Sequence, residues 1–216
     1  MIKEKTLKSK KLTQLDFIHA QQLIQKQGIP TCPTTAIRNA AQFKAAQKIP
    51  FPWAMKAIGK KLLHKTDVGG LKLNIQNENE ARDIFKRMKK IPGCEYVIVQ
   101  PMRKGIELIV GGKMDPQFGP TVLLGMGGIY TEIFKDSSVR VAPLGKNDIE
   151  EMIHELKIYP ILQGARGQKG INFNELKKIV RVVSQLMSSG KISELDLNPV
   201  MATPENVEAV DVRIIN

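Results

Sequence analysis

The stretch WAMKAIGKKLLHKTDVGGLKL, residues 53–73, contains the pattern around which the rest of the chain is arranged. Its first six residues are apolar apart from Lys56 and predict a buried β-strand. A lysine-rich loop with one histidine, His64, follows, and Gly69-Gly70 closes it. Apolar and polar residues then alternate over 71–75, which predicts a second strand. A basic, glycine-closed loop between two strands suits the binding of phosphate.

The composition is that of an ordinary globular protein with an excess of positive charge. The chain has 216 residues, of which 42% are hydrophobic and 25% charged, enough for one large domain or two small lobes. The formal net charge of +12 permits binding to nucleic acid. However, aromatic residues make up only 5% of the chain and are not interleaved with the lysines as on a base-stacking surface. We therefore expect no nucleic-acid partner.

The ends and the cysteines indicate a cytoplasmic location. No apolar run approaches the roughly 18 residues that a membrane-spanning helix needs. Residues 1–12 are basic and lack the apolar core of a secretion signal, so we expect a flexible tail. Cys32 and Cys94 are far apart and do not have metal-binding spacing. These features predict a cytoplasmic protein without membrane contact.

The order of predicted elements favours an α+β fold. Helices are predicted before Gly28, over 35–48, and after caps at Asn77 or Asn79, Asn147 and Asn172. Strands are predicted at 96–99, 105–111, 121–124, 129–134 and 139–141, without a helix between them, and then at 192–197 and 207–214. Such a run of strands favours antiparallel pairing. We expect two lobes around one cleft, covering about 13–100 and 101–216.

Acidic and amide side chains near the C terminus are candidate metal ligands. Glu194, Asp196 and Asn198 alternate along one predicted strand and therefore share a face. Oxygen ligands of this kind suit Mg²⁺. A solvated edge strand produces the same pattern, and spacing alone favours that alternative. Asp211 lies within another predicted strand, where it is either half-buried and paired or simply on the outward face.

A glycine cluster and an arginine add to the possible phosphate contacts. Gly125, Gly127 and Gly128 lie between two predicted strands, which excludes a Rossmann fingerprint or a P-loop. They form either a sharp turn only or a turn whose backbone amides approach phosphate. Arg140, between two valines, either contacts phosphate through its guanidinium or occupies an exposed strand position.

Lys56 and His64 each have a functional and a plain structural interpretation. A buried lysine is costly unless it is paired, and a nucleotide phosphate is one candidate partner. The alternative is a solvent-facing lysine on a half-exposed strand. His64 carries an imidazole that can act as a nucleophile at neutral pH. A histidine in a loop is more often only a polar surface group.

Eight segments occur in an order that is specific as a set, although each is weak alone: LLHKTDVGGLKLNI (62–75), VIVQPM (97–102), GIELIVGG (105–112), DPQFGP (115–120), LLGMGGIYTEIFKD (123–136), SSVRVAPL (137–144), ISELDLNPV (192–200) and AVDVRI (209–214). Together they resemble the ATP-grasp β subunit of ADP-forming acyl-CoA synthetases of the acetate–CoA ligase type. The resemblance runs from about Asp16 to the C terminus.

This resemblance implies a fold, a reaction and a partner. The fold is ATP-grasp, two α+β lobes with ATP or ADP and Mg²⁺ between them. The reaction is acyl-CoA + ADP + phosphate ⇌ acid + CoA + ATP, passing through phosphohistidine. In the family an α subunit carries the CoA-binding and first phosphohistidine domains. We therefore expect a hetero-oligomer of α and β chains and a β chain that is inactive alone.

The resemblance also implies roles for individual residues. It assigns nucleotide binding to a strand lysine, a hinge and an acid after the hinge, namely Lys56, then Val99, Gln100 and Met102 beside the adenine, and Glu107. It assigns Mg²⁺ to Asp196 and Asn198, with Glu132 and Asp211 as further candidate ligands. Arg140 matches a phosphate contact, and His64 matches the histidine that takes phosphoryl from the α subunit and passes it to ADP.

Two other functions remain open at this point. One is another ATP-grasp ligase, such as a succinyl-CoA synthetase-like β subunit or a carboxylate–amine ligase, which would not need His64 in this loop. The other is a basic nucleic-acid-binding protein, whose binding would depend strongly on salt. Lys60-Lys61 and the basic tail depart from the family pattern. The preferred acid is not predicted, because acyl specificity should lie largely in the partner.

Overall fold

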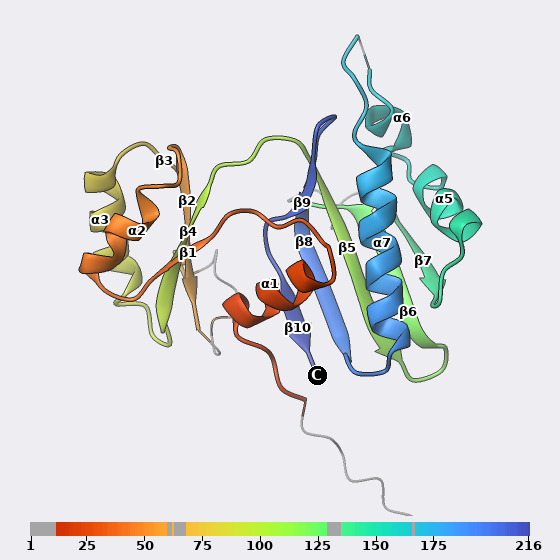
Figure 1. The fold of residues 1–216 in the computed structure, drawn as a ribbon, viewed down its shortest axis with the longest axis horizontal. Helices are drawn as coiled ribbons and strands as arrows, with labels where there is room; N and C mark the ends of the chain where they lie inside the picture. The colour runs from red at the N-terminus through yellow and green to blue at the C-terminus, as the bar shows by residue number, and fades with distance from the viewer. Residues whose placement is uncertain (1–11, 60–61, 63–67, 129–134, 166) are drawn as a thin grey trace, which may run out of the picture.

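Two antiparallel β-sheets with their helices make up the structure, a computed structural model that describes residues 12–59, 62, 68–128, 135–165 and 167–216. The smaller sheet has the strand order β1-β4-β2-β3. Its strands are β1 (Thr35–Ile37), β2 (Trp53–Ile58), β3 (Leu71–Ile75) and β4 (Tyr96–Pro101), and its helices are η1 (Ala40–Gln42), α2 (Phe43–Ala46) and α3 (Glu78–Met88). Figure 1 shows these elements together at one end of the molecule.

The larger sheet has the strand order β10-β8-β5-β6-β7, with β9 also paired to β8. Its strands are β5 (Ile106–Asp115), β6 (Gly119–Met126), β7 (Ser137–Val141), β8 (Glu194–Ala202), β9 (Val207–Ala209) and β10 (Arg213–Ile215). Its helices are α1 (Phe17–Lys26), α5 (Lys146–His154), α6 (Tyr159–Leu162) and α7 (Phe173–Ser188). The structure therefore confirms the predicted α+β fold.

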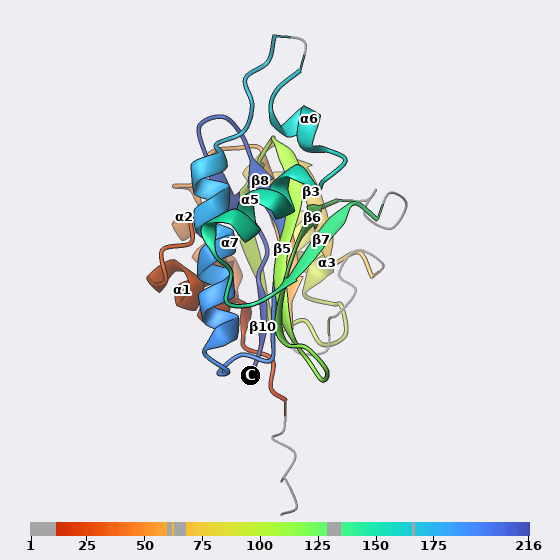
Figure 2. The same ribbon diagram turned by 90° about the vertical axis from the view of Figure 1, so that its right-hand side faces the viewer.

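Helix α7 covers one face of the larger sheet. Its apolar stripe, at Leu176, Ile179, Val183 and Met187, lies in the main core together with Leu195 and Leu197 of β8. Figure 2 shows α7 along one side of the sheet, with α1 on the same side. Because side chains alternate along a strand, the neighbours of these leucines on β8 point to the opposite face.

Helix α1 packs where the cores of the two sheets meet. Asp16 caps α1 by accepting a hydrogen bond from the Ile18 amide at 3.1 Å, as expected of an N-cap. Phe17, Ala20 and Ile24 lie in the core cluster of the larger sheet, which also takes in Ile58, Tyr96 and Ile98 of the smaller sheet. Helix α1 therefore packs in a core that both sheets share, and the predicted boundary between the lobes stays a prediction.

Two predicted elements are wrong. The helix predicted over 35–48 begins as strand β1, which pairs with Val97–Val99 of β4 and completes the edge of the smaller sheet. Only residues 40–46 are helical. The strand predicted over 207–214 is interrupted between β9 and β10, and Asp211 lies in the interruption. Sheet pairing outweighed the alanine-rich helical pattern in the first case. The strand predicted at 129–134 lies outside the described residues.

No helix in the part of the chain that the structure describes is long and apolar enough to cross a membrane.

Candidate functional site

Lys56 reaches from the smaller sheet to the larger one. It lies within β2 and is only 5% exposed. Its Nζ donates to the Val210 carbonyl at 3.2 Å and lies 3.4 Å from Oδ2 of Asp211. These contacts compensate the ammonium for its loss of water. The prediction of a buried, paired lysine is therefore confirmed, although its partners here are protein groups, and the solvent-facing alternative is wrong.

Asp196 is the second charged group at this junction. It is half-buried on β8, and burial raises the pKa of its carboxyl group. The nearby charges of Asp211 and Glu194 raise the pKa further, while Arg213 lowers it. Carboxylates that repel one another in this way favour the binding of a cation between them. Asp196 of β8 and Asp211 of the β9–β10 connection are therefore close enough for their charges to interact.

This donor set fits Mg²⁺. Magnesium is usually held by one or two protein carboxylates, with the other ligands from water and substrate phosphates. Among the described residues, no three His, Cys, Asp or Glu side chains form a metal cluster. Asp196 and Asp211 could supply the two carboxylates, and the exposed Asn198 follows Asp196 on the same face of β8. Glu132, another predicted ligand, lies outside the described residues.

Glu107 and the glycine cluster lie on the same face of the larger sheet as Asp196. Gly111 of β5 pairs with Asp196, and Glu107, four residues earlier on β5, points to that face. The Gly127 amide donates to the Glu107 carbonyl at 2.8 Å. Gly128 has a φ of +77°, and a Cβ there would overlap Oε2 of Glu107. The turn therefore needs glycine to pack on Glu107, and its contact with phosphate stays a prediction.

The hinge residues differ in what they present. Val99 is buried in the core of the smaller sheet. Gln100 is fully buried, and its side chain points inward, where Nε2 donates to Oγ1 of Thr34 at 2.9 Å and to the Val210 carbonyl at 3.0 Å. Only the half-buried Met102 keeps its side chain partly exposed. Sequence patterns could not reveal the role of the Gln100 side chain, because its partners are distant along the chain.

Arg140 is not brought together with these residues. Arg140 on β7 pairs with Val122 on β6, Val122 pairs with Gly112 on β5, and Gly112 pairs with Leu195 on β8. Residues paired in this way share a face, and Leu195 faces the core, so Arg140 lies on the core-facing side of the sheet. Its guanidinium forms an ion pair with Glu155, the residue that caps α5. Asp196 lies on the other face. We therefore assign Arg140 no contact with the nucleotide.

His64, predicted as the phosphoryl-carrying histidine, lies in the loop after β2 and outside the described residues. The described residues on either side connect this loop to the site. Strand β2 carries Lys56, and β3 pairs with β2 at the same point through Leu71. Leu71, the first residue of β3, is therefore directly opposite Lys56.

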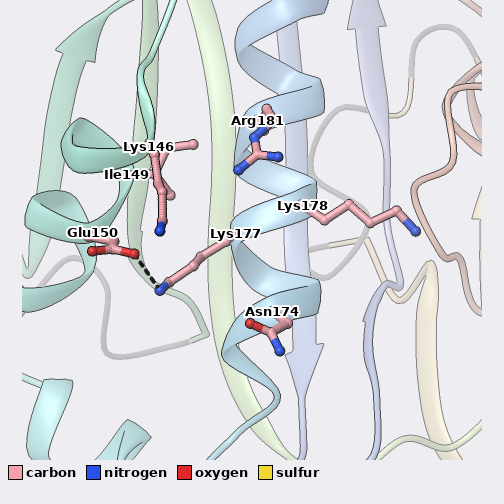
Figure 3. Close-up of a pocket in the computed structure, with 7 residues that line it drawn as sticks. All are labelled: Lys146, Ile149, Glu150, Asn174, Lys177, Lys178 and Arg181. Atoms are coloured by element: carbon pink, nitrogen blue, oxygen red, sulfur yellow. Dashed lines mark hydrogen bonds and ion pairs between the residues drawn. The ribbon is translucent and has the colours of Figure 1, made fainter.

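A separate polar pocket of about 350 Å³ lies between α5 and α7. Figure 3 shows the charged ends of Lys146, Lys177 and Arg181 gathered there, while Lys178 extends away from α5. Lys177 forms an ion pair of 3.0 Å with Glu150. This pocket lies on the helix-covered face of the larger sheet and contains none of the predicted site residues, so it is distinct from the junction at Lys56.

Comparison with known proteins gives consistent relatives. An ATP-grasp domain family model matches residues 6–215. The β subunit of ADP-forming acetate–CoA ligase I from Pyrococcus furiosus is 40% identical over 206 residues, with 91% of this chain and 89% of that subunit covered. The ADP-forming 4-hydroxybutyrate–CoA ligase of Nitrosopumilus maritimus is 38% identical, with 90% of this chain covered but only 30% of that longer protein.

A solved structure agrees with these relatives. The dinucleotide-forming acetyl-coenzyme A synthetase 1 of Ca. Korarchaeum cryptofilum, in complex with coenzyme A, Ca-AMPCP and HgCl⁺, superposes with a TM-score of 0.85 at 34% identity. The match covers 94% of this chain and 93% of that one. The chain therefore belongs to the ATP-grasp family and, within it, to the β subunits of ADP-forming acetate–CoA ligases.

Proposed function

We propose that this chain is the nucleotide-binding subunit of an enzyme that interconverts acyl-CoA, ADP and phosphate with acid, CoA and ATP, with acetyl-CoA as the first candidate substrate. The observation that carries the proposal is the junction at which Lys56 of the smaller sheet meets Asp211, beside Asp196 of the larger sheet. A cation and two acids facing one another between two lobes suit a magnesium-bound diphosphate.

The residues of the junction would bind different parts of the magnesium nucleotide. Lys56 would bind phosphate oxygens, and Asp196, Asp211 and Asn198 would hold Mg²⁺, which when bound neutralises phosphate charge. Phosphoryl transfer depends chiefly on such positioning and charge neutralisation. His64 would take the phosphoryl group from a phosphohistidine of the partner and pass it to ADP. When the phosphoryl group passes from His64 to ADP, the P–N bond to His64 breaks and a P–O bond to the terminal phosphate of ADP forms.

An α subunit completes the enzyme in this proposal. The related P. furiosus chain is named a β subunit, which supports a partner chain with the CoA-binding and phosphohistidine domains. A related Korarchaeum enzyme was solved with coenzyme A, acetyl-coenzyme A and a phosphorylated phosphohistidine segment. Cys32 and Cys94 are both free, in keeping with a reducing cytoplasm. We therefore propose a cytoplasmic hetero-oligomer of α and β chains.

The test is reconstitution with the purified α subunit. ATP formation from acetyl-CoA, ADP and phosphate is measured for each chain alone and for the mixture, with a panel of other acyl-CoA thioesters alongside. We expect ATP only when both chains are present. A mixture that forms a complex but makes no ATP from any thioester would overturn the proposed reaction.

A further inference from the structure

A partly buried hydrogen-bond network joins the two sheets around the hydroxyl group of Thr34. This hydroxyl accepts hydrogen bonds from Nε2 of Gln21 and Nε2 of Gln100, both at 2.9 Å. It donates to the Cys32 carbonyl, also at 2.9 Å. Nε2 of Gln100 donates a second hydrogen bond, of 3.0 Å, to the Val210 carbonyl. The amide of Gln100 thereby connects β4 to the break between β9 and β10.

The Val210 carbonyl is consequently held by two donors. Gln100 donates from one side and Lys56 from another, at 3.0 and 3.2 Å. Both side chains are buried, with exposed fractions of 0% and 5%. Lys56 divides its ammonium between this carbonyl and the carboxylate of the next residue, Asp211. Gln100, in contrast, donates to the Val210 carbonyl and does not contact the Asp211 carboxylate in any hydrogen bond of the described residues.

We propose that Gln100 is a positioning residue, which holds the Val210 carbonyl and therefore Asp211 in place while Lys56 turns to a nucleotide phosphate. The inference rests on the proposed function and concerns the same site. Without nucleotide, Lys56 and Asp211 neutralise each other. A magnesium-bound diphosphate competes for both, since phosphate binds the ammonium and the cation binds the carboxylate. Gln100 then remains as a donor to a carbonyl that is otherwise left unpaired.

Substitution of Gln100 by methionine isolates this role. In the ligand-free protein the Val210 carbonyl keeps Lys56 as its donor, and the Thr34 hydroxyl keeps Gln21. Oε1 of Gln100 has no hydrogen-bond partner within the described residues, so its loss leaves no group unpaired. The variant should therefore fold with a thermal midpoint close to that of the wild type. The deficit should appear only when Lys56 is drawn away.

The matched control is Gln21→Met. Gln21 is the other buried glutamine on the Thr34 hydroxyl, but it donates to the Cys32 carbonyl and does not contact Val210. The full-length wild type, Gln100→Met and Gln21→Met are titrated calorimetrically with ADP over a range of Mg²⁺ concentrations. Thermal unfolding without nucleotide is measured in parallel.

We expect Gln100→Met to bind ADP roughly tenfold more weakly and to need more Mg²⁺ for half-saturation, because binding now leaves the half-buried Val210 carbonyl without either of its side-chain donors. Gln21→Met should keep the wild-type affinity. Equal affinities in wild type and Gln100→Met, or an equal loss in Gln21→Met, would overturn the inference while the wild type still binds ADP. Failure of the wild type to bind ADP would instead overturn the proposed function. Gln100→Leu gives the same test if the methionine variant does not fold.

Discussion

At the scale of single residues, Asp196 shows a conflict between ligand binding and stability. Its pKa is raised by burial and by the charge of Asp211, so its ionised form is unfavourable in the folded protein. A group with a raised folded-state pKa contributes stability at low pH and loses it as the pH rises through that pKa. A bound cation would reverse the effect, because the same carboxylates then become ligands.

Asp196→Asn should therefore stabilise the ligand-free protein and weaken Mg²⁺-dependent ADP binding. We expect a thermal midpoint about 1–3 °C higher at pH 7, with the advantage shrinking as the pH falls below the raised pKa. Thermal unfolding over a pH series and an ADP titration with Mg²⁺ measure the two effects. A variant with unchanged affinity for Mg-ADP would contradict the metal assignment.

Asp115 provides a control, because its pKa is shifted in the opposite direction to that of Asp196. The amides of Phe118 and Gln117 hold the pKa of the Asp115 carboxyl group below its usual range. Its contribution to stability is present at neutral pH and is lost as the pH falls. Asp115→Asn should lower the thermal midpoint at pH 7, approach the wild type in acid, and leave ADP binding unchanged.

His64 is the residue whose role depends most on the family resemblance. His64→Ala should abolish ATP formation by the reconstituted enzyme, because no other group is proposed to carry the phosphoryl to ADP. His19→Ala is the control, since the His19 side chain is 76% exposed on α1 and has no proposed role. Normal turnover in the His64 variant would remove this residue from the mechanism.

At the scale of elements, the glycine turn after β6 yields a steric prediction. Gly128 and Gly119 have nearly equal φ angles, +77° and +76°. Substitution of either glycine by alanine therefore carries the cost of a left-handed alanine. Only Gly128 has a neighbour that an added Cβ would overlap, namely the Glu107 carboxylate, while nothing lies within 4 Å at Gly119.

Gly128→Ala should displace Glu107 and weaken ADP binding, by roughly tenfold if the displacement costs one hydrogen bond at the site. Gly119→Ala should share the loss of stability and keep its affinity. Calorimetric titration and thermal unfolding of both variants separate the two effects. Equal affinities would show that the turn does not organise the site.

The sequence predicted those elements whose pattern is local. The apolar run at β2, the alternation of β8 and the stripe of α7 each follow from the period of one element. The alanine-rich pattern predicts a helix where strand β1 lies, because the pairing of β1 with β4 is a contact with residues about sixty positions away. The local pattern does not reveal the break between β9 and β10 for a similar reason, since Lys56 and Gln100 of the other sheet donate to the Val210 carbonyl there.

The same reasoning explains which parts of the site could be predicted. Lys56 is conspicuous as a charge within an apolar strand, and Asp196 and Asn198 lie at alternating positions. The family resemblance puts Gln100 in the hinge beside the adenine, which stays a prediction, and the sequence gives no sign that the Gln100 side chain points into the junction. The family resemblance predicts a phosphate contact for Arg140, whereas strand register puts it on the face of the sheet opposite Asp196. Register between distant strands was not available from spacing alone.

At the scale of the whole molecule, the two sheets meet at a point where each contributes a charge of opposite sign. The smaller sheet contributes Lys56, and the larger contributes Asp211 beside Asp196. The excess of positive charge elsewhere, including the pocket between α5 and α7, is not needed for this junction. Nucleotide binding should therefore depend on Lys56 far more than on other lysines of the same lobe.

The most direct test is a calorimetric titration of the full chain with ADP, with and without Mg²⁺. The variants are Lys56→Met and, as a control, Lys72→Met, which removes an exposed lysine from the adjacent strand β3. We expect one Mg²⁺-dependent site in the wild type and in Lys72→Met, and at least about tenfold weaker binding in Lys56→Met, because a charge-assisted hydrogen bond to phosphate is lost. Equal ADP affinity in Lys56→Met and Lys72→Met would contradict a nucleotide site between the two sheets.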